Sequence, residues 1–554
     1  MASLAATKKF FLAGTLAAIV ALPFLVRERG RAINAATDDT VVILTGHNEN
    51  LRFELGQGFQ KWYKEQTGRT VFVDWRYLGG VSEIVRYLDS VYGNAFRLYW
   101  EKELGQPWNG AVQGAFVRRT ADSSRWTDPV QREVCKAFYG SDIGSGIDIF
   151  FGGGVSEFVI QADRGTIVDC GFLREHPELF CESCIPPRVG DEPLWDGEGR
   201  WFGQCLSTLG ILCNRAVLAA RGLEDKDVGQ WAQLTDPRLF GSVALADPTK
   251  SSALLKAYET IIQQQMLFRE RELAGSGQRF SSEKERKMQI VGEGWLRGLR
   301  TLQLIAANTR YFADAPTKMI LDVASGNSAV GIIVDFLGEA QAAFDRSRCG
   351  WDRLHFFSPP NGTVVSPDPI AVLRGAPNRE VAKLFLEYIL GEEGQKIIVF
   401  RVGTPGGPIR NELFRPAVNR KVYDKAYAPY RTTGTDDQIQ VLERSALTYR
   451  PEYTASVYST LKWMIKFAFM VPHRELVEAW AAILSARTEG RSDDAERALR
   501  ILEDFSGFAY DEINDVFAAV LQPTRPAAAL EVQRRIAGHF RDQYLLAKRT
   551  AEGI

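Results

Sequence analysis

The chain has 554 residues, a formal net charge of −1 and 45% apolar residues. This composition is close to the globular average, which excludes general disorder, a collagen-like repeat and a disulfide-stabilised mini-protein. The balanced charge gives no basic footprint, so we expect no nucleic-acid partner. At roughly 150 residues per folding unit, the length predicts about three to four units.

A hydrophobic segment lies near the amino terminus. Lys8 and Lys9 precede the charge-free run 10–26, which is long for the apolar region of a signal peptide and at the short limit for a membrane span. Two interpretations stay open: residues 1–38 are a cleaved signal peptide with its spacer, or they anchor the protein to the inner membrane. Both place the rest of the chain in the periplasm or another extracytoplasmic compartment. A buried core helix is the alternative, which the basic residues on both sides disfavour.

Strands and helices alternate in the first part of the chain. We expect buried strands at 40–44, 71–75 and 147–151, each followed by a helix, with the second helix running from Ser82 to about Tyr92. This alternation implies a parallel sheet with crossover helices. Residues 93–145 interrupt it with three tryptophans and mixed charge, and we expect an inserted subdomain there.

A second set of α/β units begins near Trp201. Strands are expected at 206–212, 242–246 and 329–334, and the strand at 368–373 returns to the character of the first set. After about residue 440 only helical segments are predicted, separated by proline and glycine. The carboxyl-terminal part therefore differs in class from the two α/β sets.

The seven cysteines include one C-x-x-C pair, Cys181 and Cys184. No second such pair is present to complete a zinc site, so we expect no metal there. In an oxidising compartment a structural disulfide is favoured over redox chemistry.

Three turns that follow predicted strands could hold a ligand. The run Asp247-Pro-Thr-Lys-Ser-Ser252 offers hydroxyls and the free N–H groups of a helix start, which favour an anion. Gly152-Gly-Gly154 would let a ligand approach bare backbone, and Thr45-Gly-His47 is the third turn. Each also has a structural interpretation: a helix cap, a tight turn and a structural histidine.

Four longer runs carry a resemblance. They cover residues 196–215, 231–252, 308–336 and 361–396, and they include WAQLTDPRLFGSVALADPTKSS and NSAVGIIVDF. Together they resemble the extracytoplasmic solute-binding proteins of ABC transporters. More narrowly, they are similar to the family 1 group with ferric-iron-binding and phosphorylated-solute-binding members.

The resemblance implies a type II periplasmic-binding fold, which is an α/β architecture of two lobes joined by two crossover strands with the ligand between them. We expect the crossovers near Gln204–Cys213 and Pro359–Val372. The expected organisation is lobe 1 at 39–205 with an insertion at 93–145, lobe 2 at 206–358, a return to lobe 1 at 359–440, and an all-helical extension at 441–554.

The resemblance also implies the ligand contacts. In the iron-binding relatives adjacent tyrosines follow the strand that here ends at Val334, and this chain has Asp335-Phe336 instead, so tyrosine-type iron coordination is not expected. Asp335 suits an amine or a sugar hydroxyl, and hydroxyls with helix starts suit a phosphate, phosphonate or carboxylate. The implied contacts are Thr45, His47, Gly152, Gly153, Gly154, Ser207, Thr208, Thr249, Ser251, Ser252, Asn308, Arg310, Thr317 and Asp335.

The favoured function is the capture of a small anionic organic solute for an ABC importer, with its permease subunits as partners, a monomeric state and no cofactor. One alternative is a ferric-iron transport protein that uses His47 and Asp335 together with Glu157 or an external anion. Another is a membrane-anchored sensor or interaction protein whose helical extension docks a partner. Because the chain has no G-x-S-x-G, P-loop or H-E-x-x-H motif and only five scattered histidines, we do not expect an enzyme.

Overall fold

The structure is a computed structural model that describes residues 37–432, 437–521 and 526–554. The hydrophobic run 10–26 lies outside the described residues, so the signal-peptide and anchor interpretations stay predictions. Within the described ranges, no helix has both the length and the hydrophobicity that a bilayer crossing requires.

The first five-stranded sheet forms lobe 1, and its order is β2-β1-β3-β12-β6. β1 pairs in parallel with β2 and β3, whereas β12 is antiparallel to both of its neighbours. Its strands are β1 (Asp39–Thr45), β2 (Val71–Tyr77), β3 (Ile149–Phe151), β6 (Phe202–Ser207) and β12 (Ser366–Val372).

The second sheet forms lobe 2 and repeats this topology, with the order β9-β8-β10-β7-β11. β8 is parallel to β9 and β10, whereas β7 is antiparallel to β10 and β11. Its strands are β7 (Leu209–Asn214), β8 (Val243–Ala246), β9 (Thr309–Ala313), β10 (Val330–Val334) and β11 (Leu354–Phe357). In each sheet the fourth strand is the antiparallel one. This confirms the two-lobed type II periplasmic-binding fold.

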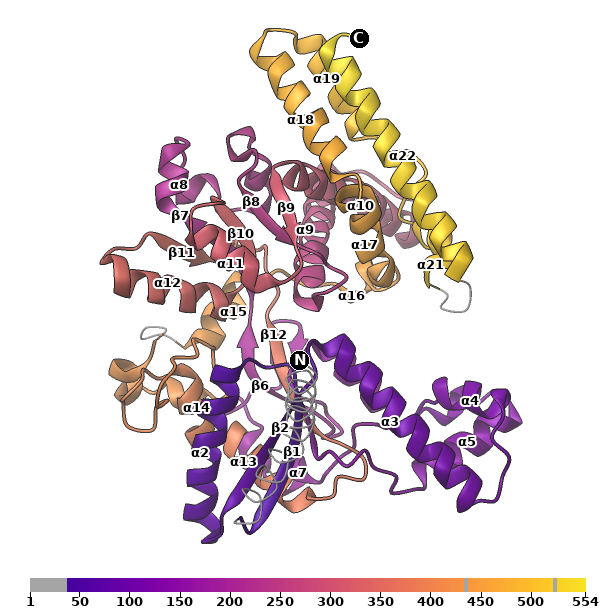
Figure 1. Ribbon diagram of the computed structural model, residues 1–554, viewed down its shortest axis with the longest axis vertical. Coiled ribbons are helices and arrows are strands. Elements are labelled where there is room, and N and C mark those ends of the chain that lie inside the picture. Colours follow the sequence, from indigo (N-terminus) through magenta and orange to yellow (C-terminus); the bar gives the residue numbers. More distant parts are fainter. Residues whose placement is uncertain (1–36, 433–436, 522–525) are drawn as a thin grey trace, which may run out of the picture.

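The chain crosses between the lobes at two short connections. Thr208 alone separates β6 in lobe 1 from β7 in lobe 2, and residues 358–365 connect β11 to β12. Figure 1 shows β6 and β12 rising between the two sheets. A third passage follows residue 445, because Ile439 and Leu442 still lie in the lobe 1 core and Leu447 already lies in that of lobe 2. There Leu447 N donates to Thr363 O at 2.7 Å. The first two crossovers overlap the ranges expected from the sequence, whereas the third passage was not expected.

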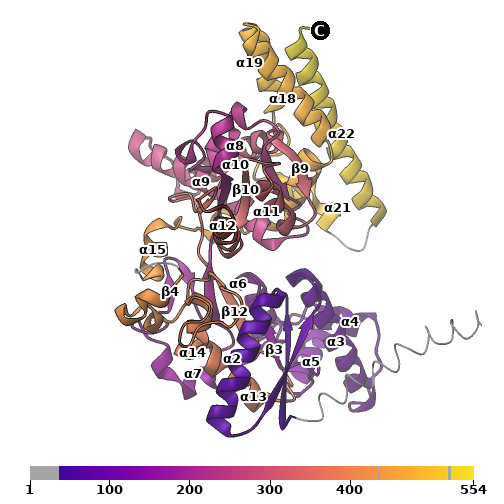
Figure 2. The same cartoon turned by 60° about the vertical axis from the view of Figure 1, so that its left-hand side comes forward.

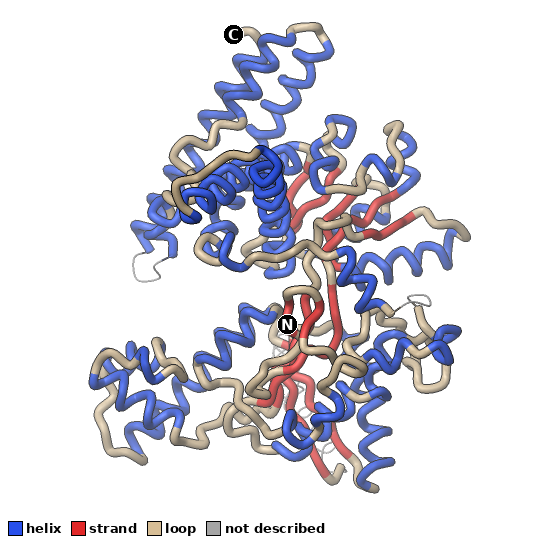
Figure 3. The backbone as a smooth tube through the Cα atoms, turned by 180° about the vertical axis from the view of Figure 1, so that it is seen from behind, coloured by secondary structure: helices blue, strands red, loops and turns tan. Residues whose placement is uncertain are grey.

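Helices cover both faces of the lobe 1 sheet, and each face has its own apolar core. One face carries α2 (Glu49–Thr67), α13 (Arg379–Leu390) and α14 (Glu392–Val399). The other carries α3 (Val81–Lys102) and α6 (Val155–Asp163). Figure 3 shows the strands of the lobe 1 sheet running between helices.

The prediction that a helix ends near Tyr92 was wrong, because α3 continues to Lys102. Its buried stripe keeps an i, i+4 spacing through Tyr92, Phe96 and Trp100, so Gly93 does not end the helix. Within residues 93–145, α4 (Gly110–Val117) and α5 (Pro129–Tyr139) pack onto this second half of α3. The rings of Phe96 and Phe116 stack with centroids 4.8 Å apart.

The carboxyl-terminal helices share one core with lobe 2. Apolar side chains of the lobe 2 sheet, of α9 (Ser252–Ser276) and of α10 (Glu283–Ala307) belong to the same buried cluster as those of the extension. Trp295 Nε1 of α10 donates to Phe508 O of the extension at 2.9 Å. Figure 2 shows the extension packed along lobe 2 and reaching beyond it. Its helices are α16 (Pro451–Thr454), α17 (Tyr458–Ile465), α18 (His473–Thr488), α19 (Ser492–Leu502), α20 (Ile513–Val516), α21 (Ala518–Leu521) and α22 (Pro526–Glu552). α15 (Gln438–Ser445), which precedes them, instead buries Ile439 and Leu442 in the lobe 1 core.

The remaining elements are short or lie at the edges of the lobes. Lobe 1 carries α7 (Phe172–Glu175) and the hairpin of β4 (Arg188–Val189) and β5 (Glu192–Pro193), and lobe 2 carries α8 (Arg215–Ala220), α11 (Pro316–Ala324) and α12 (Asp335–Cys349). All seven cysteines lie in the described part of the chain and are free thiols. The disulfide expected between Cys181 and Cys184 is not formed: the Cys181 thiol lies 3.3 Å from Ser183 Oγ.

Candidate functional site

The carboxyl ends of parallel strands from both lobes meet beside the crossovers. β1 and β3 end there in lobe 1, and β8 and β10 end there in lobe 2. In α/β sheets ligands bind outside these strand ends. We call this region the interlobe site and define it by Thr45–His47, Gly152–Gly154, Ser207–Thr208, Asp247–Ser252, Asp335–Phe336, Asp368 and Arg415.

A buried polar group forms the lobe 1 side of the interlobe site. Arg415 Nη1 donates to Asp368 Oδ2 at 2.5 Å, and Gly153 N donates to Asp368 Oδ1 at 2.8 Å. His47 Nε2 lies 3.5 Å from Asp368 Oδ2 and makes no hydrogen bond to any described residue. The Arg415 guanidinium also lies 3.8 Å from the ring centroid of Phe336, which belongs to lobe 2. Arg415 therefore contacts both lobes.

Burial shifts the pKa values of this group. It lowers the pKa of His47 to about 4, so the imidazole is neutral at neutral pH. Burial opposes ionisation of Asp368, but the charges of His47 and Arg415 hold the pKa of this carboxyl below its usual value. Burial also raises the pKa of the Cys205 thiol to about 12 although Arg415 lies beside it. At neutral pH the group thus holds one ion pair and one neutral imidazole nitrogen.

Asp335 ties the hinge to lobe 2. Thr208 N and Oγ1 donate to Asp335 Oδ2 at 2.9 and 3.2 Å, and Phe336 N donates to Asp335 Oδ1 at 2.7 Å. Burial nevertheless dominates and raises the pKa of Asp335 to about 7. Both carboxylate oxygens accept hydrogen bonds from the protein itself, which supports a structural role for this residue. Ser207 ends β6 directly before Thr208.

The turn after β3 requires glycine. Gly152 and Gly153 have φ values of +93° and +134°, and a Cβ on Gly152 would lie 2.5 Å from His47 Nε2. Residues with side chains rarely adopt such φ values. Gly154 is the N-cap of α6 and has no side chain, so it cannot cap the first N–H groups of that helix. Gly152 N and Gly153 N donate to Pro369 O and Asp368 Oδ1, both at 2.8 Å, so the backbone donors that this turn offers are those at the start of α6. Thr45 Oγ1 accepts from His47 N at 3.1 Å and fixes the neighbouring turn.

The turn after β8 opens α9 on the lobe 2 side. Thr249 N and Oγ1 both donate to Asp247 Oδ1, at 2.8 and 2.6 Å. Ser251 caps α9 by accepting from Leu254 N at 3.3 Å, and Ser252 is exposed at the first position of the helix. These are the hydroxyls and the helix start that the sequence indicated, and α9 is long enough to carry a full dipole.

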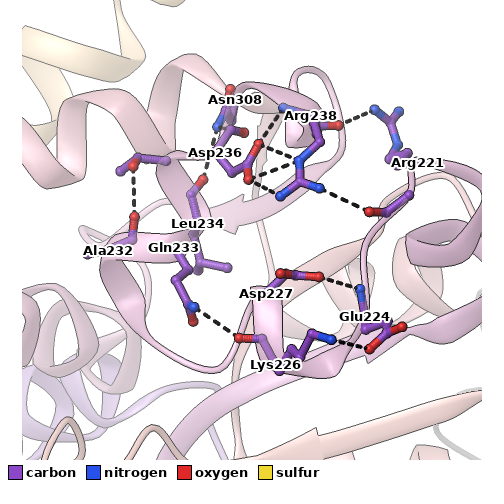
Figure 4. Close-up of polar contacts among 12 residues, drawn as sticks. Arg221, Glu224, Lys226, Asp227, Ala232, Gln233, Leu234, Asp236, Arg238 and Asn308 are labelled. Atoms are coloured by element: carbon purple, nitrogen blue, oxygen red, sulfur yellow. Dashed lines mark hydrogen bonds and ion pairs between the residues drawn. The ribbon is translucent and has the colours of Figure 1, made fainter.

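Asn308 does not join the interlobe site. It precedes β9, whereas the interlobe site lies beyond the carboxyl ends of the strands. Its side chain is fully buried: Nδ2 donates to Leu234 O and Asp236 O, and Oδ1 accepts from Trp480 of the extension. Figure 4 shows Asn308 among these backbone contacts. The structure thus gives this residue a structural role, because its amide satisfies the hydrogen bonds of buried backbone carbonyls.

Arg310 and Thr317 are both exposed. Arg310 is the second residue of β9 and lies toward the amino end of that strand, away from the interlobe site. Thr317 lies in the first turn of α11, beyond the carboxyl end of β9. Of the fourteen residues proposed from the sequence, the structure therefore gathers those on Thr45–His47, Gly152–Gly154, Ser207–Thr208, Thr249–Ser252 and Asp335.

No sequence pattern indicated three residues of this region. Asp368 begins the strand that was expected at 368–373, but its partners His47 and Arg415 are far away in the chain. Arg415 lies on a loop with no motif, and Lys466 of the extension reaches Asp247. Only the three-dimensional fold brings such residues together.

One other cluster in the described residues has metal-ligand chemistry. Atoms of Cys213, Asp225 and His355 lie within 4.8 Å of one another in lobe 2. Arg215 Nε donates to Asp225 Oδ2 at 2.9 Å, so a guanidinium already pairs with this carboxylate. The cluster lies toward the end of β7 opposite the hinge and contributes nothing to the interlobe site.

Comparisons with known proteins agree with this architecture. The family model described as "Bacterial extracellular solute-binding protein" matches residues 142–432. This is just over half of the chain, and it confirms the resemblance found in the sequence.

One curated relative is the phosphoglycerate transport regulatory protein PgtC of Salmonella typhimurium, which is 23% identical over 285 residues. The alignment covers 51% of this chain and 57% of that relative, so the chain spans little more than half of its length.

Two solved structures are also similar. The periplasmic binding protein AfuA from Actinobacillus pleuropneumoniae, with exogenous fructose-6-phosphate bound, has 15% identity and a TM-score of 0.42, covering 73% of this chain and 97% of its own. The apo ferric ion-binding protein A of Pasteurella haemolytica has 12% identity and a TM-score of 0.43, covering 77% and 96%.

Proposed function

Because the chain belongs to the bacterial extracellular solute-binding protein family, we propose that it captures a small anionic organic solute between its two lobes. The solute carries a phosphate, phosphonate or carboxylate group. The lobes close about the hinge at Thr208, and the closed protein delivers the solute to the permease subunits of an ABC importer outside the cytoplasm. The protein acts as a monomer.

One observation carries this proposal: uncapped or hydroxyl-rich helix starts from both lobes lie at the strand ends beside the hinge. Gly154 opens α6 in lobe 1, and Ser251 opens α9 in lobe 2. Both helix starts present backbone N–H groups and a positive dipole end, which favour an anion. Arg415 contacts both lobes through Asp368 and Phe336.

The donor atoms favour an organic anion over ferric iron. The two oxygens of Asp335 already accept N–H groups, and Asp368 is paired with Arg415. A hard cation would have to displace these hydrogen bonds and approach a guanidinium. An oxyanion instead finds donors that are still open: the N–H groups at Gly154 and the exposed hydroxyl of Ser252. The phosphorylated solutes in the names of two similar proteins support the same class.

The test compares phosphorylated solutes with their dephosphorylated counterparts. We expect calorimetric titration of the purified full chain to show saturable binding of 3-phosphoglycerate or fructose 6-phosphate and none of glycerate or fructose. A ligand at one hundred times its Kd should stabilise the protein by about 2.7 kcal/mol. Failure of every phosphate, phosphonate and carboxylate tested to bind would refute the proposal.

A matched pair of variants locates the binding. Ser251→Ala removes the cap of α9, and Ser282→Ala removes the equivalent cap of α10, whose Oγ accepts from Glu285 N at 3.1 Å. Each variant should lose about 1 kcal/mol of stability. Only Ser251→Ala should weaken solute binding. Equal affinities of the two variants would contradict a site at the start of α9.

A further inference from the structure

The helical extension reaches the turn that opens α9. Lys466 Nζ lies 3.2 Å from Asp247 Oδ2 and 3.2 Å from Thr249 Oγ1, and these partners are 219 and 217 residues earlier in the chain. In Figure 1, α16 and α17 lie at the side of lobe 2 that faces lobe 1. A residue outside the two α/β lobes therefore contacts the lobe 2 part of the interlobe site.

Lys466 is held in place by the packing of the extension. It begins a π-helical turn, Lys466–Met470, in which Phe467, Ala468 and Phe469 are buried. Tyr544 Oη donates to Ala468 O at 2.9 Å and ties this turn to α22. π-helical turns inside α-helices often mark functional sites. The side chain of Lys466 is 30% exposed, so its ammonium group is fixed but still reaches solvent.

A second set of contacts fixes α16 to α9. Gln263 Nε2 donates to Arg450 O at 2.9 Å and to Thr454 Oγ1 at 2.7 Å. Tyr449 Oη donates to the buried carboxylate of Glu259 at 2.8 Å. These bonds hold the start of the extension against lobe 2 and set the position of α17, which carries Lys466 at its end.

The negative charge of Asp247 must be neutralised before an anionic ligand can bind at this turn, and Lys466 is placed to do so. Its carboxylate is 5% exposed and lies directly before the helix start that would bind the anion. An unpaired carboxylate there would repel a phosphate or carboxylate group. The lysine inside the same turn does not neutralise it, because Lys250 Nζ pairs with Asp314 Oδ1 at 2.7 Å instead. Lys466 supplies the missing charge.

The extension also faces lobe 1. Burial raises the pKa of Glu157 on α6, and the charge of Lys462 on α17 counters that shift. Charges of the extension thus act on the first turn of α6, the second helix start of the interlobe site.

We propose that the extension is a functional part of the solute site, in which Lys466 neutralises Asp247 and donates its third N–H to the anionic group of the solute. This inference rests on the proposed function. An ammonium group has three donors, and two of them point to Asp247 and Thr249. The alternative is that Lys466 only attaches the extension to lobe 2.

Substitutions in the full chain separate the two roles. Lys466→Gln removes the charge, Lys466→Arg keeps it, and Lys548→Gln is the control, because Lys548 pairs with Glu478 within the extension at 3.0 Å. With 3-phosphoglycerate and fructose 6-phosphate as probes, we expect Lys466→Gln to raise the Kd at least about tenfold and the other two variants to change it less than about threefold. The double variant Asp247→Asn with Lys466→Gln should recover affinity, because the repelling carboxylate is also gone.

The outcomes are distinguishable. Unchanged affinity of Lys466→Gln, with wild-type protein that binds a probe, would overturn this inference and leave the proposed function standing. So would a failure of the double variant to bind more tightly than Lys466→Gln, since charge would then not be the cause. A wild-type protein that binds no phosphate, phosphonate or carboxylate would overturn the proposed function and this inference together.

Discussion

His47 and Asp335 should give the stability of the protein two opposing pH dependences. Burial lowers the pKa of His47 from 6.5 to about 4. Between these values the unfolded state binds the extra proton, so the histidine makes the free energy of unfolding rise with pH. The shift of roughly 2.5 pKa units corresponds to about 3 kcal/mol, which is lost as the pH falls through this window.

Asp335 acts in the opposite direction. Burial raises its pKa from 3.8 to about 7, so the native state binds the proton that the unfolded state has released. Its contribution is therefore fully present below the unfolded pKa and is lost as the pH rises through the folded pKa. The shift of roughly 3.2 units corresponds to about 4 kcal/mol.

Substituting each residue removes its pH dependence, so the difference in unfolding free energy between variant and wild type measures it. We expect the unfolding free energy of His47→Gln minus that of wild type to fall by about 3 kcal/mol as the pH rises from 4 to 6.5. The same difference for Asp335→Asn should rise by about 4 kcal/mol between pH 4 and 7. Urea unfolding followed by tryptophan fluorescence at several pH values measures both. Substitution of the exposed His539 by Gln controls for the loss of a histidine as such. Differences of the same sign in the two variants would contradict the opposite pKa shifts of His47 and Asp335.

Three further substitutions test the interlobe site and its boundary. Arg415→Met leaves Asp368 buried without its partner and should lower the free energy of unfolding by about 3 to 5 kcal/mol. As a control, Arg86→Met in the exposed pair with Glu83 should lower it by less than about 1 kcal/mol. Urea unfolding compares the two variants, and equal losses would contradict the buried pairing. Gly152→Ala forces a side chain into a backbone with φ +93° against His47 and should cost at least about 1 to 3 kcal/mol by the same measurement, with a neutral result contradicting the close approach. Asn308→Ala leaves buried hydrogen-bonding groups without a partner, so it should lower the free energy of unfolding by at least about 1 to 3 kcal/mol. It should leave solute affinity unchanged in calorimetry. Unchanged stability with weaker solute binding would indicate that Asn308 contacts the ligand.

Local patterns in the sequence predicted several strands but missed β9 and β11. The prediction of one strand at 206–212 was wrong, because Thr208 divides this run between β6 of lobe 1 and β7 of lobe 2. The expected strand at 329–334 corresponds to β10, and the one at 242–246 corresponds to β8, because short apolar runs bounded by turn residues identify buried strands. The helix after the second strand was predicted too short at Tyr92. Gly93 suggested a break, but the apolar spacing on both sides of it outweighs the cost of one glycine.

The polar contacts could not be predicted in this way. The hydrogen bond between Arg415 and Asp368 joins residues 47 positions apart, and no local sequence pattern predicts it. The contact of Lys466 with Asp247 spans 219 positions and depends on how the extension packs. Asn308 shows the converse: its neighbours in the sequence resemble a ligand-binding run, but the extension contributes Trp480 and encloses the amide. Partner choice in such cases follows from the tertiary packing.

The central claim is that the two lobes capture a small anionic organic solute at the interlobe site. Titration of the purified full chain with 3-phosphoglycerate and fructose 6-phosphate, before and after the combined substitution of Ser251 by Ala and Lys466 by Gln, tests it most directly. We expect saturable binding to the wild-type chain, and we expect the combined substitution to weaken it by at least about tenfold. Binding that the substitution leaves unchanged, or no binding of any anionic solute, would contradict it.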